Sequence, residues 1–570
     1  MSTAAEFETE PVSADKLQSG KTFAASYAGE HVAGTEFVIG ALFVAWGVGT
    51  GDILWGLLLG NLLAVLTWAL VTAPIATDTR LTLYAYLEKI AGPGTIKLYS
   101  VINGVLFCIL AGAMITVSAS AVKIVFGIAP QTEWYPTDLS FVLVALAVGT
   151  VVVLMAMKGF KKLAAFAEIC APWMILMFIV GALVLMPTLV SATSDVASIS
   201  SFDDFLSVAD QYIWVDTGGD IGFWHVAAFA WICNLAMHGS MGDMTIFRFA
   251  KSSKYGYYSA LGMFIGHYVA WICAGIMGAA AALLLKASIT ELDAGVVAFQ
   301  ALGSAGIIAV IIAGWTTSNP TIYRAGLAFQ SLNYKWDRTK VTMVVGIVTT
   351  IIACFPFVFS QLLGFLGIMG LMLAPVGAII VAEHWLFPKL GFTRYWSKYK
   401  GNNTNIAAMT TWVLSLGISY YLVVADVLHM FFILLPIWIF ATIVYSGLAS
   451  LMGAKASYPQ AIVDEKAELV RKADEQKYLH AGQPTATTEK VQLPLLASIA
   501  KSVSWLALIA CLTLGVLSFV NQNVELATTW LIVPTLIYFV TATYAYIAKE
   551  ELLEEAVVDD ISIETSESLV

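Results

Sequence analysis

Fourteen runs of mostly apolar residues follow one another along this chain of 570 residues. About 20 consecutive apolar residues are the length that an α-helix needs to cross the hydrocarbon core of a bilayer. Small residues recur inside the runs, which favours close helix packing in lipid. We therefore predict about 14 transmembrane helices, near residues 22–47, 51–76, 98–127, 139–159, 163–189, 222–245, 257–285, 302–331, 340–358, 361–386, 405–425, 428–452, 497–520 and 524–547.

The composition agrees with this pattern and excludes several classes of protein. Hydrophobic residues make up 59% of the chain and charged residues 12%, and the mean hydropathy is +0.81. Soluble domains carry about 25% charged residues, so a water-soluble enzyme and a disordered chain are both excluded. The net charge of −10 and the absence of a basic block argue against a nucleic-acid partner. The six cysteines lie singly in apolar runs, which predicts buried hydrophobic residues.

The distribution of Lys and Arg predicts the orientation. With the N-terminus inside, 27 of the 29 basic residues, Arg80, Arg248 and Arg324 among them, fall in cytoplasmic segments, whereas residues 190–220 carry six Asp and no basic residue. We therefore expect a multi-pass protein of the cell (inner) membrane with both termini cytoplasmic. The predicted parts are an N-terminal tail (1–20), a twelve-helix core (21–452), a cytoplasmic linker with one amphipathic helix (453–496), two added helices (497–547) and an acidic tail (548–570).

Glycines and polar residues interrupt the first and sixth predicted helices. Glu30, His31, Thr35 and Glu36 lie in the first, and Asn234, His238 and Ser240 lie in the sixth. Charged groups inside a membrane are costly and therefore indicate a functional site. Two breaks five helices apart predict inverted five-helix repeats, about 21–189 and 222–386, with a site between them. Alternatively, the first helix begins at Phe37, and His238 is a packing histidine.

The eighth predicted helix carries adjacent hydroxyls, Thr316 and Thr317, close to Asn319 and Pro320. Hydroxyl oxygens beside a helix loosened by proline offer hard ligands that suit Na⁺. The alternative is that they bond to the carbonyls of their own helix. Glu168 and Glu383 are lesser candidates, for an ion pair or a proton relay. No nucleotide-binding or catalytic motif is present, so we expect energy from an ion gradient and no enzymatic activity.

Several stretches resemble the nucleobase–cation symporter (purine/cytosine permease) family. The resemblance covers about residues 20–450 and is carried by residues 315–319, 322–323, 325–328, 365–383, 60–63 and 247–250. It implies an all-α, LeuT-type fold and secondary active symport. It also implies a Na⁺ site made by the hydroxyls of Thr316 and Thr317, the carbonyl of Ala313 and helix 1 carbonyls between Ala33 and Glu36. The chain differs from the family in that residues 111–120 contain no Trp and helix 1 is charged.

These observations predict a secondary active transporter that couples a small polar, nitrogen-containing solute, such as a nucleobase-like or vitamin-like heterocycle, to Na⁺ or H⁺. The alternatives are transport of an amino acid or amine, and a sensor or scaffold without transport. We expect no cofactor, and as partners the solute and the bilayer. The candidate residues are Thr35, Glu36, Thr116, Asn234, His238, Ser240 and Asn319 for solute; Ala33, Glu36, Ala313, Thr316 and Thr317 for Na⁺; and Glu30, His31, Glu36 and His238 for proton coupling.

Overall fold

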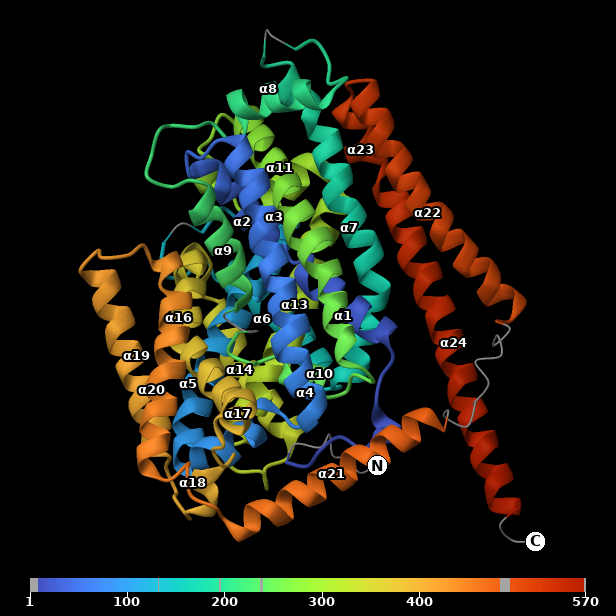
Figure 1. Cartoon of the computed structure of the whole chain (residues 1–570). Helices are drawn as coiled ribbons and strands as arrows, with labels where there is room; N and C mark the ends of the chain where they lie inside the picture. Colours follow the sequence, from blue (N-terminus) through green and yellow to red (C-terminus); the bar gives the residue numbers. More distant parts are fainter. Residues whose placement is uncertain (1–8, 132, 194–195, 236–238, 482–492, 568–570) are drawn as a thin grey trace.

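The computed structural model describes residues 9–567 except 132, 194–195, 236–238 and 482–492, and it is helical almost throughout (Figure 1). The first half contains η1 (Ala14–Lys16), α1 (Gly20–His31), α2 (Gly34–Ala45), α3 (Thr50–Thr67), η2 (Trp68–Thr72), α4 (Ala73–Thr79), α5 (Leu83–Val125), α6 (Leu139–Ala156) and α7 (Phe160–Val190). The short helix α8 (Phe202–Tyr212) lies in the acidic loop that follows.

The second half repeats the succession of long helices. It contains α9 (Phe223–Leu235), α10 (Met244–Phe247), η3 (Ser253–Tyr258), η4 (Leu261–Val269), α11 (Ala270–Leu285), η5 (Ile289–Glu291), α12 (Ala294–Leu302), α13 (Ser304–Gln330), α14 (Arg338–Ala353), α15 (Phe357–Ser360), α16 (Leu362–Val381), η6 (Ala382–Leu386) and α17 (Phe387–Leu390). The C-terminal part contains α18 (Trp396–Tyr399), α19 (Ile406–Val424), η7 (Met430–Phe432), α20 (Leu434–Met452), α21 (Pro459–His480), α22 (Leu495–Val520), α23 (Val524–Trp530) and α24 (Ile532–Glu567).

The prediction of an all-α membrane fold is confirmed. Among the described residues, 11 helices are long and apolar enough to cross a membrane, and the bent pair α1–α2 makes a twelfth. The sixth and ninth predicted segments are also helical, but α9 has 13 residues and α14 has 16, which is short for a span. Within the residues that the structure describes, each of the 14 apolar runs thus contains helix, and 12 of them reach the spanning length.

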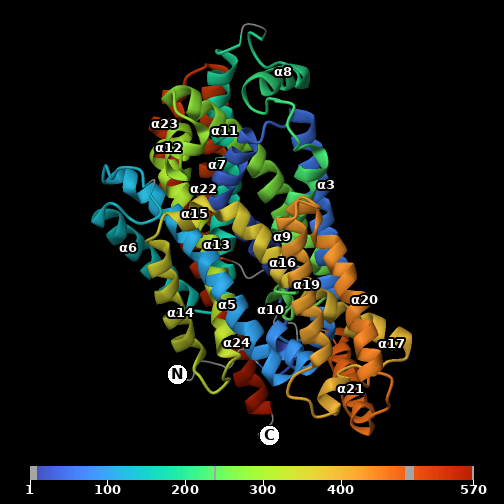
Figure 2. The same ribbon diagram turned by 90° about the vertical axis from the view of Figure 1, so that its left-hand side faces the viewer.

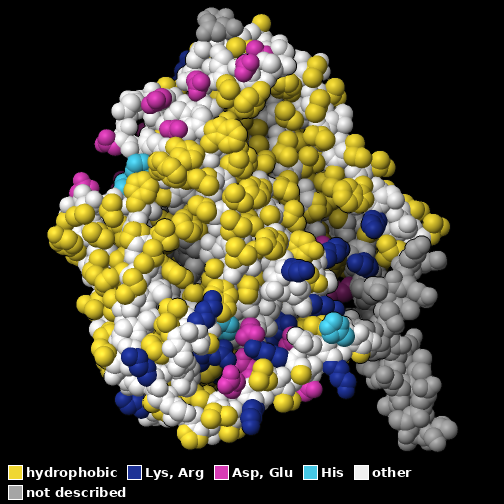
Figure 3. Space-filling view, in the orientation of Figure 1, with side chains coloured by type: hydrophobic (Ala, Val, Ile, Leu, Met, Phe, Trp, Pro, Cys, Tyr) yellow, Lys and Arg dark blue, Asp and Glu magenta, His cyan; other side chains and the backbone are white. Residues whose placement is uncertain are grey.

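Charge divides the molecule into two ends. Acidic side chains lie near α8, whereas basic side chains, with acidic ones among them, gather at the opposite end, where both chain termini lie; we call this the basic end (Figures 1 and 3). A broad apolar surface separates the two. Arg324, which the count of basic residues includes among the cytoplasmic segments, lies inside α13 and is fully buried.

Two added helices, α22 and α24, lie beside α7 on one side of the core, while α21 crosses the basic end (Figures 1 and 2). The Trp173 indole of α7 donates a hydrogen bond to the hydroxyl of Thr535 at 3.2 Å. The Tyr538 hydroxyl donates to the carbonyl of Ile169 at 2.7 Å. These bonds, made by buried side chains, attach the C-terminal pair to the core.

Candidate cation and solute site

The first membrane segment is broken in its middle. α1 ends at His31, α2 begins at Gly34, and the two axes differ by 51°. Val32 and Ala33 between them have non-helical backbone angles and are buried. A helix end leaves carbonyl and amide groups without partners in the helix, and in a membrane these need other partners. The predicted interruption of helix 1 is therefore present, with its charged residues buried in the protein.

Glycines allow three helices to meet closely at this break. A Cβ atom on Gly34 would lie 2.6 Å from Val117 of α5 and 3.2 Å from the backbone nitrogen of Gly314 in α13. A Cβ atom on Gly314 would lie 1.9 Å from the Ser118 hydroxyl. Small residues of this kind let membrane helices approach backbone to backbone. They bring the start of α2 and the middle of α13 into direct contact.

Four oxygen atoms from α1 and α13 converge beside the break. The Thr317 hydroxyl lies within hydrogen-bond distance of two carbonyl oxygens, that of Glu30 at 3.0 Å and that of Ala313 at 3.2 Å. The neighbouring Thr316 hydroxyl donates to the same Ala313 carbonyl at 3.0 Å. The hydroxyls therefore bond to their own helix, as the alternative prediction states, and Thr317 also reaches helix 1, while their role as Na⁺ ligands stays a prediction. Two hydroxyls and two carbonyls are uncharged hard ligands that fit Na⁺.

The helix 1 carbonyl at this point belongs to Glu30, three residues before Ala33. The carbonyl of Ala33 accepts a hydrogen bond from the backbone amide of Glu36 at 3.1 Å, as part of the start of α2. The structure therefore assembles the predicted oxygens of Ala313, Thr316 and Thr317 with Glu30 as their helix 1 partner.

The side chain of Glu30 belongs to a buried ionic network. Its carboxylate pairs with the guanidinium of Arg324, which also pairs with Asp243 at 2.8 Å. The Trp68 indole donates to the second oxygen of Asp243 at 2.5 Å. All four residues are at most 4% exposed. Two carboxylates thus share one guanidinium, and the network links α1, α13, η2 and the segment before α10.

The Glu36 side chain packs against the helix formed by η4 and α11. Its carboxylate accepts hydrogen bonds from the Trp271 indole and, at 3.3 Å, from the Thr35 hydroxyl, and it lies 3.5 Å from His267 Nε2. The His267 ring stacks on Trp271, with ring centres 4.4 Å apart. The His31 ring packs edge-on against His267 at 4.9 Å. Glu36 and His31 thus form a buried cluster with the helix formed by η4 and α11.

Three of the predicted solute residues contact other parts of the protein. The Thr116 hydroxyl lies within bonding distance of the carbonyls of Gly112 and Ala353, and the Asn234 amide donates to the carbonyl of Ala230 at 2.7 Å. Ser240 is buried in the turn between α9 and α10, where a Cβ atom on Gly377 would lie 3.2 Å from its Cα. His238 lies outside the described residues.

Asn319 is buried like Thr116 and Asn234, but within the described part of the chain its side chain lacks the hydrogen bonds that theirs make. Its side chain is 1% exposed, and neither the amide nitrogen nor the amide oxygen has a hydrogen-bond partner among the described residues. Leaving a buried amide without partners costs about 1–3 kcal/mol, so such groups normally contact water or a ligand. Asn319 therefore offers a donor and an acceptor in the interior, one turn from Thr316.

Sequence reasoning missed Arg324, His267, Trp68 and Trp271 as part of this region. Arg324 lies seven residues after Thr317, on the same side of α13, and this spacing is the signal that could have identified it. The other three lie in ordinary apolar runs. Only the tertiary fold brings them to the helix 1 break.

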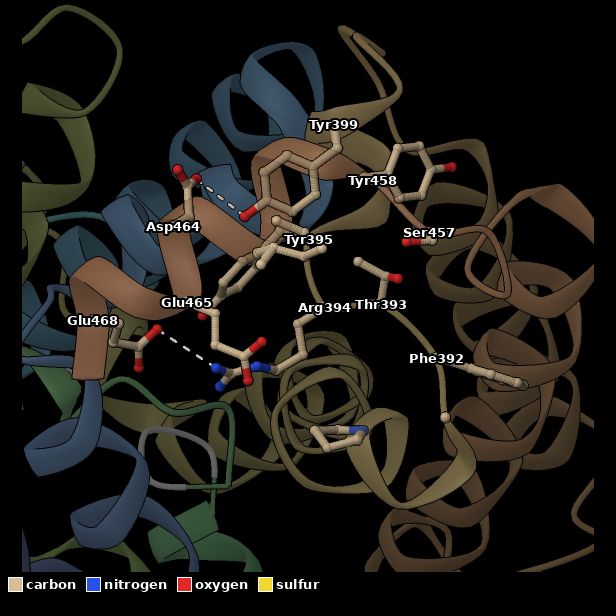
Figure 4. Close-up of a pocket in the computed structure, with 14 residues that line it drawn as sticks. Phe392, Thr393, Arg394, Tyr395, Tyr399, Ser457, Tyr458, Asp464, Glu465 and Glu468 are labelled. Carbon is tan, nitrogen blue, oxygen red and sulfur yellow. Dashed lines mark hydrogen bonds and ion pairs between the residues drawn. The ribbon is translucent and has the colours of Figure 1, made fainter. Parts of the chain in front are cut away.

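A separate polar cavity of about 310 Å³ lies at the basic end, between α21 and the segment joining α17 to α18 (Figure 4). Arg394 pairs with Glu468 at 3.5 Å, and the Tyr399 hydroxyl donates to Asp464 at 3.0 Å. The cavity lining includes none of the predicted solute or cation residues. It therefore belongs to the attachment of α21, apart from the helix 1 break.

Comparison with protein-family models and with curated proteins finds no match. Solved structures do match. A Na⁺-coupled sialic acid symporter in a substrate-bound outward-open state is 16% identical, with 76% of this chain and 89% of that chain covered and a TM-score of 0.53. Mhp1, a nucleobase-cation-symport-1 family transporter, is 15% identical in a closed conformation with bromovinylhydantoin bound (79% and 97% covered, TM-score 0.58) and 15% identical in an inward-facing conformation (77% and 93%, 0.57). This chain therefore has the LeuT-type fold that its sequence predicts.

Proposed function

We propose that this protein is a secondary active symporter that couples inward movement of a small polar, nitrogen-containing solute to Na⁺ by alternating access. The observation that carries the proposal is the convergence of the Thr316 and Thr317 hydroxyls with the Glu30 and Ala313 carbonyls at a break in a membrane helix. The similar structures are those of a Na⁺-coupled symporter and a nucleobase–cation transporter, which supports the same function.

Sodium would act here as a transported driving ion. The four oxygens carry no formal charge, and the Glu30 carboxylate is already paired with Arg324, so a monovalent cation suits the site better than a strongly charged one. An ion that contacts both α1 and α13 favours the conformations in which these helices are close together. Solute binding then shifts the population toward the occluded and inward-open states.

Asn319 is the residue around which we place the solute. A primary amide donates and accepts at once, and it therefore complements a solute that carries both nitrogen donors and carbonyl acceptors. The other proposed solute residues are Thr35, Glu36, Thr116, Asn234, His238 and Ser240. We further propose that the basic end faces the cytoplasm of the cell membrane, in accordance with the positive-inside rule.

The cation assignment is tested without knowledge of the solute. We expect the purified protein to melt at a higher temperature in NaCl than in choline chloride of equal ionic strength, because a ligand of the native state stabilises it by mass action. At 100 times the dissociation constant the gain is about 2.7 kcal/mol. Thr316→Ala with Thr317→Ala should abolish this difference.

Thr321→Ala is the matched control for that experiment. Thr321 lies in the same helix, is fully buried and donates its hydroxyl to the carbonyl of Thr317 at 2.8 Å. This variant should keep the sodium-dependent shift. A double Thr316/Thr317 variant that melts normally and retains the full shift contradicts the sodium site. Adding nucleobases, vitamins, amino acids and amines to the same assay identifies the solute class.

Proton coupling is a second candidate, and the buried contact between Glu36 and His267 favours it. Two titratable groups inside the membrane, with His31 against them, are typical of proton pathways. Uptake of the identified solute into vesicles, driven by a pH gradient in sodium-free buffer, distinguishes the two. Uptake under that condition supports proton coupling, and uptake only with a sodium gradient supports the Thr316/Thr317 site.

A further inference from the structure

A groove runs along the junction between the core and the two added C-terminal helices. It consists of two adjoining cavities of about 270 and 480 Å³, bordered by α1, α7, α22 and α24. Lys21, Glu168, Lys501, Ser504 and Tyr538 line both cavities, so the two lie directly side by side. The groove is separate from the helix 1 break and the proposed function does not use it.

One end of the groove is basic. Lys21 of α1, Lys501 of α22 and Lys549 of α24 line it, and Glu168 of α7, the one carboxylate among the described residues of its lining, forms an ion pair with Lys21. Lys549 lies within electrostatic range of Lys21, Lys501 and Glu168. Basic side chains gather beside the C-terminal helices, where the apolar surface ends (Figure 3). Three lysines around one carboxylate leave two positive charges for an anionic ligand.

The rest of the groove is apolar and lies along membrane-spanning helices. Its walls include Ala24, Ala28, Ile175, Ile265, Trp505 and Leu508. These residues belong to helices whose composition places them in the bilayer. A ligand that fills the whole groove therefore has a negative head at the lysines and a hydrocarbon part that extends into the membrane.

We propose that this groove binds one anionic phospholipid, with its phosphate between Lys501 and Lys549 and an acyl chain along α1 and α22. Basic pockets between membrane helices are the recurrent binding mode for anionic lipid headgroups. The apolar part of the groove favours a phospholipid over a free phosphate ion, because a phosphate ion has no hydrocarbon part to fill it. Because the lipid contacts α1, the first half of the broken helix, it holds this half against the added helices.

The test is native mass spectrometry of the full chain in detergent, after removal of co-purified lipid. The probes are dioleoyl phosphatidylglycerol, dioleoyl phosphatidylcholine and inorganic phosphate. We expect one tight site for phosphatidylglycerol alone. In Lys501→Glu with Lys549→Glu its affinity should fall at least about 30-fold, because each basic side chain near a membrane surface contributes about fivefold to anionic lipid binding.

Lys254→Glu with Lys335→Glu is the matched control, since both lysines are exposed, lie outside the groove and give the same change in charge. It should bind phosphatidylglycerol within about twofold of the unaltered protein, because only the groove lysines contact the headgroup. If charge reversal prevents folding, Lys501→Gln with Lys549→Gln replaces it. Equal affinity of the groove variant, equal binding of phosphatidylcholine, or competition by inorganic phosphate at equal concentration each overturns the proposal.

Discussion

At the scale of single residues, Glu30 connects two features of the site. Its backbone carbonyl accepts from Thr317, and its carboxylate pairs with Arg324. Thr317 and Arg324 both belong to α13, so one residue of α1 is held twice by the same helix. A change in the ionic network is therefore transmitted to the proposed cation ligands through the position of one peptide group.

Removing the buried cation of this network should destabilise the protein strongly. Arg324→Met leaves Glu30 and Asp243 buried without their shared partner, and an uncompensated buried charge costs about 3–5 kcal/mol. Chemical denaturation in detergent measures the loss. The triple variant Glu30→Gln, Asp243→Asn, Arg324→Met should recover most of it, because it leaves no unpaired charge. Equal stability of the single variant and the unaltered protein contradicts this account.

Asn319 should behave in the opposite way. Asn319→Leu removes a buried amide that has no protein partner among the described residues, so the ligand-free protein should be as stable or more stable, by about 1–3 kcal/mol. Solute binding should nevertheless be lost. Thermal unfolding without ligand, followed by uptake in vesicles, measures both. A large loss of stability in the ligand-free protein indicates a structural role for Asn319 and argues against the solute assignment.

At the scale of elements, α21 joins parts of the basic end that are far apart in sequence. Glu475 pairs with Arg80 at 2.5 Å, and Lys472 pairs with Asp78 at 2.6 Å. Arg80 is 2% exposed and also donates to the carbonyls of Arg248 and Ala250. The linker helix is therefore tied to the end of α4 and to the segment after α10 through one arginine.

Neutralising Glu475 should release α21. In Glu475→Gln we expect faster amide hydrogen exchange both in α21 and around residues 248–251, because the buried Arg80 loses its carboxylate partner. Asp464→Asn is the comparison, since the Asp464–Lys398 pair is more exposed and such pairs contribute about 0–1 kcal/mol. Exchange that rises equally in both variants, or in neither, contradicts a special role for the Arg80–Glu475 pair.

At the scale of the whole molecule, the features that depend on local sequence could be predicted. Each apolar run became a helix because crossing a bilayer requires a continuous stretch of apolar residues. The break after His31 was also predictable, since charged residues and glycines stand together there. The hydroxyls of Thr316 and Thr317 were proposed as cation ligands because of a resemblance to known symporters, and the structure places them beside the helix 1 break, while their role as ligands stays a prediction.

The partners across helices could not be predicted in this way. Arg324 is separated from Glu30 by 294 residues and from Asp243 by 81, and no local pattern records such a pairing. The predicted helix 302–331 contains Arg324, but no neighbouring residue in that helix indicates that the guanidinium is buried. The carboxylates of Glu30 and Asp243 compensate its charge and so allow this burial. The place of His267 and Trp271 in this region likewise became apparent only in the structure, where both contact Glu36.

The glycine contacts at the break have one more consequence. Gly34 seats α2 against α5 and α13 by shape, whereas polar and charged side chains hold α1 on its side of the break. Close packing leaves a helix little room to move, and ion pairs as buried as Glu30–Arg324 are screened only weakly by dissolved salt. The two halves of one membrane segment are thus held by different means: a larger side chain at position 34 should displace α2, whereas the attachment of α1 should depend on the charges of its ionic network and little on the ionic strength of the solution.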